Sequence, residues 1–282
     1  MYQREDIKTK IYNQGRDLEV ALYNYYFLND ERVNITYALS LYQNEDGGFG
    51  HGLEPDNTNP NSTNFQTSYA LELLVNSGFN KDNLDEFTNL LVNQAVEYLK
   101  KQLKDDLWVA TDESNNDFNC AIWWKHNDEN LFFENPTVSI LGTLLVLLDE
   151  KDSFYQTVVK LALKYQAYFM TSEVKEKHLI ACYMYLYQGL KHSNLIKDFL
   201  MYDKLSNDIK NSIDDKSTWG SGYQTTPFSY PLYDDNYKLS DELINDNLSF
   251  LAETYKGNYW DINFTWGNED DGFDVQSIKW QA

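Results

Sequence analysis

The spacing of apolar residues along the chain predicts a mostly helical protein. Residues 18–28 carry apolar side chains at helical intervals, including Val20, Leu22, Tyr25 and Phe27. The same periodicity predicts further helices at residues 33–42, 65–77, 84–103, 137–148, 154–169, 173–190, 195–213 and 241–255. Alternating apolar and polar residues are too rare to indicate a sheet. We therefore expect an all-α protein of about nine or ten helices.

Residues with known preferences for helix ends support several of these boundaries. Ser62 or Thr63 can cap the helix that ends at Gly78, and Ser240 can cap the last predicted helix. Asn135 followed by Pro136 is typical of a helix start. The helix after it, TVSILGTLLVLL, is apolar on nearly every side, so we expect it to be buried all round.

A repeated turn separates the predicted helices. Residues 44–50 read NEDGGFG and residues 268–274 read NEDDGFD, so five of seven positions agree. Looser versions are KSTWGSGY at 216–223 and KDDLWVATDES at 104–114. In such a turn, Asp can bond the turn amides, Gly can adopt positive φ, and an aromatic ring can fill the space between helix ends. Repeats of this kind between helices indicate stacked helical hairpins.

Composition narrows the class of protein. The chain has 282 residues and no low-complexity linker, so we expect a single domain over residues 1–282. The net charge of −21 argues against binding nucleic acid or an anionic membrane surface. Two cysteines, Cys120 and Cys182, do not make a disulfide framework. No signal peptide and no transmembrane segment is visible, which predicts a cytoplasmic location.

The octapeptide QNEDGGFG at residues 43–50 resembles the Gln-rich aromatic repeat of squalene–hopene cyclases and protein prenyltransferase β subunits. Together with ENPTVSILGTLL and WGSGYQTTPFSYP, it looks like a group of uncharacterised bacterial prenyltransferase-like proteins. This resemblance implies an α/α toroid, a double-layered helical barrel around a central cavity. It does not supply an activity, because function in such folds depends on the residues of the cavity.

The chemical motifs of these enzymes are not reproduced. The chain lacks the Asp-x-Asp-Asp string with which class II terpene cyclases protonate their substrate. Residues 270–274 match Asp-Asp-x-x-Asp, but a glycine lies inside the match and the segment repeats a turn, so we interpret it as structural. Asp117, Cys120 and His126 do not have the spacing of the prenyltransferase zinc ligands. We therefore assign no metal site and leave the cofactor open.

The candidate catalytic residues are His51, Glu54 and Asp56. They follow the glycine-rich turn directly, in a loop that rims one mouth of the cavity in a toroid. Paired carboxylates can divide into an acid and a base when their environments separate the pKa values. They can also bind Ca²⁺ or Mg²⁺ through oxygen. The structural alternative is that they cap helices or bond turn amides.

A second group combines loop aromatics with polar residues. These candidate ligand-binding residues are Trp123, Trp124, Asn135, Tyr223, Thr226, Tyr230 and Trp266. Facing a cavity, the aromatic rings could stabilise a carbocation or stack on sugar rings. The alternative is packing at helix ends.

Three functions remain open from the sequence. The first is a terpenoid-type protein that binds an apolar isoprenoid. The second is a carbohydrate-active glycoside hydrolase or lyase, in which Asp234, Asp235 or Asp270 supplies a further carboxylate. The third is a non-catalytic scaffold for a peptide or small molecule.

Overall fold

The computed structural model describes residues 4–127, 134–196, 199–232 and 235–267. Within these ranges the chain forms ten α-helices and no β-strand, which confirms the predicted all-α class. The helices are α1 (Arg4–Gln14), α2 (Asp17–Leu28), α3 (Val33–Ser40), α4 (Asn64–Asn76), α5 (Glu86–Gln102), α6 (Thr137–Leu147), α7 (Tyr155–Thr171), α8 (Lys177–His192), α9 (Leu200–Ser212) and α10 (Asp241–Thr254). None of these ten helices has the length and apolar composition needed to cross a membrane.

Most predicted helix boundaries lie within two residues of the observed ones. The predicted caps form: the Thr63 hydroxyl accepts from the Gln66 amide at 3.1 Å, and Ser240 accepts from the Leu243 amide at 3.2 Å. Helix α8 begins later than predicted, because Glu176 caps its first turn with its carboxylate. Helix α9 also starts late, and α1 was missed because its sequence is too polar to show an apolar stripe.

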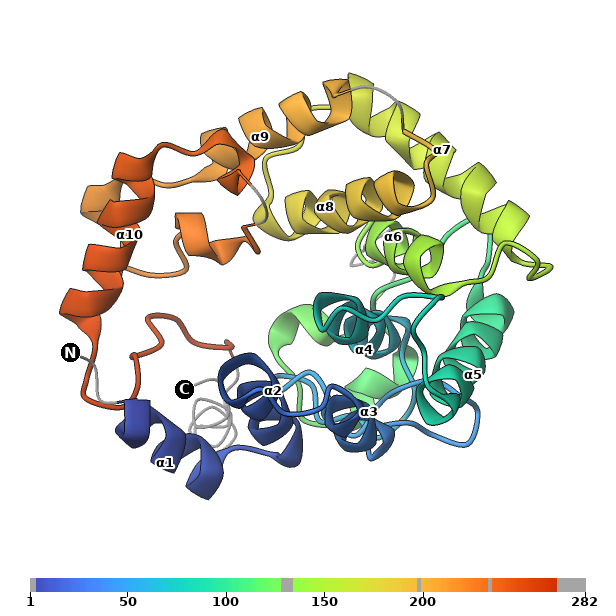
Figure 1. The fold of residues 1–282 in the computed structure, drawn as a ribbon, viewed down its shortest axis with the longest axis horizontal. Helices are drawn as coiled ribbons and strands as arrows, with labels where there is room; N and C mark the ends of the chain where they lie inside the picture. Colours follow the sequence, from blue (N-terminus) through green and yellow to red (C-terminus); the bar gives the residue numbers. More distant parts are fainter. Residues whose placement is uncertain (1–3, 128–133, 197–198, 233–234, 268–282) are drawn as a thin grey trace.

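The helices follow one another around the molecule in two layers (Figure 1). Helices α3, α5, α7, α9 and α10 lie on the outside of this view, and α4, α6 and α8 lie inside them. Along the inner layer α4 packs on α6, and α6 packs on α8. The prediction of a single domain over residues 1–282 stays a prediction.

The contact between α6 and α8 forms the centre of the core. Every residue of α6 is buried, as its sequence predicted. A side chain on Gly142 would lie 2.3 Å from the Tyr185 carbonyl carbon, and one on Gly189 would lie 2.3 Å from the Gly142 carbonyl oxygen. The two backbones therefore touch at this crossing, since neither residue has a β-carbon to separate them.

The turn at residues 44–50 joins three helices. The Asp46 carboxylate accepts hydrogen bonds from the Gly48 amide at 3.0 Å and from the Ser62 hydroxyl at 2.7 Å. The Gln43 carboxamide donates to the Gly47 carbonyl at 2.9 Å and to the Leu91 carbonyl of α5 at 3.0 Å. The predicted bond between Asp and a turn amide is thereby confirmed. The second copy of the turn, 268–274, lies outside the described residues.

Glycine is required in this turn by close approach as well as by conformation. Gly47 has φ +93°, and a β-carbon there would lie 2.2 Å from the Gln94 carbonyl oxygen of α5. The sequence suggested that glycines of this turn adopt positive φ, but Gly48 does not. A β-carbon at Gly48 would still lie 2.5 Å from that of Ser62.

We expect Gly47→Ala to destabilise the protein by about 3 kcal/mol, from about 1 kcal/mol of left-handed strain and about 2 kcal/mol of overpacking. Gly257 is a matched control, because its φ is +98° and a β-carbon there would meet nothing within 4 Å. Gly257→Ala should therefore show only the strain, about 1 kcal/mol. Urea denaturation measures both values, and equal losses would contradict the close packing of the turn on α5.

Candidate functional site

Arg16 holds the start of the loop that carries the candidate carboxylates. Its guanidinium donates to the Gly52 carbonyl at 2.7 Å and to the Leu53 carbonyl at 3.2 Å. The same guanidinium forms an ion pair with Glu19 at 2.5 Å in the first turn of α2. The backbone just before Glu54 is therefore fixed to the N-terminal end of α2, more than 30 residues earlier in the sequence.

Asp56 is buried against two indole rings. It is 5% exposed. The indole N–H of Trp124 donates to Asp56 Oδ1 at 2.6 Å, and that of Trp123 donates to Oδ2 at 3.0 Å. Burial raises the pKa of Asp56 to about 6, although the bonds from Trp124 and Trp123 lower it. The structure thus joins a predicted catalytic residue to two predicted ligand-binding residues.

Glu54 lies near two other carboxyl groups. It is half-buried, and burial raises its pKa well above the ordinary value. Repulsion from Asp56 and Glu72 raises this pKa further, while the charge of Arg16 opposes the rise. Among the described residues, no side chain donates a hydrogen bond to the Glu54 carboxylate. Glu54 therefore favours its protonated form, whereas the bonds at Asp56 favour the ionised one.

Sequence reasoning missed the third carboxyl group, Glu72 of α4. The Ser68 hydroxyl donates to Glu72 Oε1 at 2.9 Å, and Ser139 of α6 lies 3.0 Å from the Ser68 hydroxyl. Burial raises the pKa of Glu72 to about 7, against hydrogen bonds from Ser68 and Ser139 that lower it. The available signal was a single acidic residue inside the apolar run YALELLVN of a predicted helix.

Tyr223 and His178 form a second wall near these carboxyl groups. The Tyr223 hydroxyl lies 2.8 Å from His178 Nε2, the two rings stack at 5.9 Å, and Phe264 lies 4.5 Å from Tyr223. The Lys177 amino group is 3.2 Å from the centre of the Tyr223 ring.

Tyr223 is both exposed and desolvated. It is 52% exposed, yet burial raises its pKa to about 12, with further contributions from Glu176, Asp56 and Glu54. Burial likewise lowers the pKa of His178, whose side chain is 53% exposed. The charges of Asp56 and Glu54 act on Tyr223, so its ring lies near these carboxyl groups.

Other predicted ligand-binding residues have structural contacts. Trp266 is buried in a small hydrophobic cluster with Trp124, Cys120 and Ala121. The hydroxyl of buried Tyr230 lies 2.7 Å from that of Ser212 on α9.

The remaining predicted residues lie at chain turns. The Thr226 amide donates to the Ser229 hydroxyl at 2.9 Å in a one-turn 3-10 helix. Asn135 is half-buried just before α6. His51 is exposed, and its Nε2 lies 2.8 Å from the Asn44 side-chain oxygen of the glycine-rich turn. The catalytic and ligand-binding roles of all these residues stay predictions.

The structure bears on the three alternative carboxylates, on a metal site and on the cysteines. Asp234 and Asp270 lie outside the described residues. Asp235 accepts a hydrogen bond from Tyr202 of α9 and is not among the charges that act on Glu54. Within the described ranges, no group of three or more His, Cys, Asp and Glu is placed to hold a metal ion. Cys120 and Cys182 are buried and are not joined in a disulfide.

Comparisons with protein-family models, with curated proteins and with solved structures found no match to this chain. The resemblance to terpenoid cyclases and prenyltransferases therefore rests on the quoted motifs alone.

We expect Glu72→Gln to stabilise the protein at pH 8. Because the pKa of Glu72 is about 7 in the folded state and 4.5 ordinarily, the folded state keeps a proton that the unfolded chain loses. Stability from this group is thus present at low pH and lost as the pH rises through the folded pKa. The gain should be about 2 kcal/mol at pH 8 and should shrink toward pH 5.5. The control is Glu253→Gln, an exposed position on α10. Equal urea midpoints for the two variants would contradict a buried, costly charge at Glu72.

Proposed function

We propose that this protein is an α/α toroid that carries out acid–base chemistry on a carbohydrate, as a glycoside hydrolase or polysaccharide lyase. One observation supports this most directly. Glu54 and Asp56 belong to one loop, but Asp56 accepts two indole N–H bonds while the charges of Asp56 and Glu72 repel a charge on Glu54. Two carboxyl groups in different environments are what an acid–base pair requires.

Two features support the toroid. The outer helices α3, α5, α7 and α9 alternate in sequence with the inner helices α4, α6 and α8 (Figure 1). The Gln43 and Asp46 bonds of the glycine-rich turn join α3, α4 and α5, as expected for a turn that fastens two helical layers.

The proposed roles follow from the two environments. Glu54, whose pKa is raised well above its ordinary value, donates a proton to the glycosidic oxygen as the bond to the sugar carbon breaks. Asp56, ionised above about pH 6, attacks the sugar carbon or removes a proton from the attacking water. In a lyase, the same base would remove a proton from the sugar ring. Trp123, which donates to Asp56, is the ring on which we propose that a sugar stacks.

The three carboxyl groups of the candidate site disfavour an apolar ligand. An isoprenoid placed against Glu54, Asp56 and Glu72 would remove water from three carboxyl groups without giving them hydrogen bonds. A sugar offers hydroxyl groups to each of them. A non-catalytic scaffold has no need for a carboxyl group with a raised pKa beside a bonded one.

We expect Glu54→Gln and Asp56→Asn each to lower turnover of the best substrate by about 10³-fold, because each removes an acid or a base. The substrates are aryl glycosides of neutral and acidic sugars for hydrolysis, and uronate-containing polysaccharides for lyase activity. Glu45→Gln is the control, an exposed carboxylate in the preceding turn. Activity of Glu54→Gln equal to that of Glu45→Gln would sink the assignment. A wild-type protein that binds sugars without turning any over would favour the scaffold.

Trp124→Phe provides a test of the base. Loss of the 2.6 Å bond from Trp124 should raise the pKa of Asp56 above about 6. The acidic limb of the pH–rate profile should then move up by about 0.5 to 1 unit. Trp266→Phe, in the same hydrophobic cluster, is the matched control and should leave this limb in place. An unmoved limb in Trp124→Phe would exclude Asp56 as the group that titrates.

A further inference from the structure

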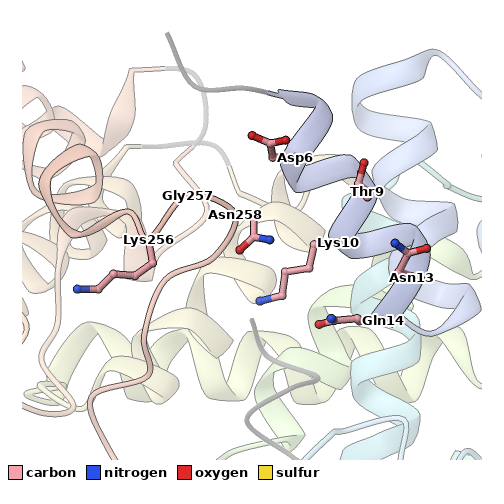
Figure 2. Close-up of a pocket in the computed structure, with 8 residues that line it drawn as sticks. All are labelled: Asp6, Thr9, Lys10, Asn13, Gln14, Lys256, Gly257 and Asn258. Carbon is pink, nitrogen blue, oxygen red and sulfur yellow. The ribbon is translucent and has the colours of Figure 1, made fainter.

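An open pocket of about 420 Å³ lies where α1 meets the segment that follows α10 (Figure 2). One wall is α1, with Asp6, Thr9, Lys10 and Gln14 among its lining residues, and the other is residues 256–258. The volume lies within the range of about 300–1,000 Å³ that is typical of small-molecule sites. The pocket shares no residue with the candidate site around Glu54.

Lys10 gives this pocket a positive centre. Its amino group lies 4.3 Å from the centre of the Tyr259 ring, and among the described residues no carboxylate is within ion-pairing distance of it. Lys256, the other lysine of the pocket, already pairs with Asp261 at 3.7 Å. Figure 2 shows the Lys256 amino group pointing away from Lys10.

The polar groups around Lys10 are unevenly distributed. In the view of Figure 2 the Lys10 amino group is drawn on the side of the pocket that also holds the carboxamides of Asn258 and Gln14. Asp6 lies toward the other end of the same view. A ligand that fits this arrangement presents an anion to Lys10 and hydroxyl groups to Asp6 and Thr9.

We propose that this pocket binds a sugar acid, a small molecule with one carboxylate and several hydroxyl groups. The carboxylate pairs with Lys10 and accepts from the Asn258 and Gln14 carboxamides. The hydroxyl groups donate to Asp6 and bond Thr9. The inference does not depend on the proposed acid–base reaction.

A ligand bound in this pocket would also hold α1 against residues 256–258. No described side chain of α1 is buried, so this helix has little packing of its own. A ligand that contacts both walls stabilises, by mass action, the state in which α1 lies against residues 256–258. Amide hydrogen exchange in α1 and in residues 256–260 should therefore slow when the ligand is bound.

The test is calorimetric titration of the full chain with D-glucuronate. Lys10→Gln should weaken binding by roughly 10-fold or more, because a charged hydrogen-bond partner is lost. Lys8→Gln, on the same helix and outside the pocket lining, should bind as the wild type does. Asn258→Ala, on the opposite wall, should also weaken binding, and Glu54→Gln should leave it unchanged.

Two further ligands distinguish the sugar acid from its parts. D-Glucose carries the hydroxyl groups without the charge, and acetate carries the charge without the hydroxyl groups. Both should bind at least 10-fold more weakly than D-glucuronate. The proposal is overturned if the wild type does not bind D-glucuronate, if Lys10→Gln binds it equally well, or if either partial ligand matches it. Loss of binding in Glu54→Gln would overturn it too, by placing the ligand at the candidate site.

Discussion

The close packing of the glycine-rich turn on α5 is the constraint on which the candidate site depends. Gly47 lies so near the Gln94 carbonyl that a β-carbon would be 2.2 Å from its oxygen. The Gln43 carboxamide then reaches the Leu91 carbonyl of the same helix. This contact fixes where the chain leaves the turn, and Arg16 fixes where it enters the next loop. The chain is thus held at two points before Glu54 and Asp56, by α5 and by Arg16 at the start of α2.

The carboxyl groups are destabilising where they are. Burial raises the pKa of Glu54, Asp56 and Glu72, and the chain as a whole carries a net charge of −21. A fold selected only for stability would place apolar residues at these positions, because burying a charge without a cationic partner is costly. Groups with shifted pKa values that lie close together are typical of catalytic sites. This is why the polar lining, more than the abundance of aromatic residues, directs the proposal toward sugars.

The two proposed binding regions differ in how well packed helices hold their walls in place. The candidate site draws its residues from α4 and the loop before it, from the loop before α6, from the first turn of α8 and from the segment after α9. The inner helices α4, α6 and α8 pack on one another beside these loops. The pocket beside Lys10 lies instead between α1 and the segment after α10, where no buried side chain of α1 holds the walls together. A ligand can therefore contribute to order there, whereas around Glu54 the order is already provided by the core.

The sequence by itself determined the helices from α2 to α10, the Thr63 and Ser240 caps, and the glycine-rich turn, because each depends mainly on residues within a few positions of one another. It also marked Glu54 and Asp56 as candidates. Only the tertiary structure decided that Trp123 and Trp124, 67 and 68 positions away, donate to Asp56. It alone placed Glu72 near Glu54 and brought Lys10 beside Tyr259. Periodicity reports which face of a helix is apolar, but it does not report which distant backbone that face meets.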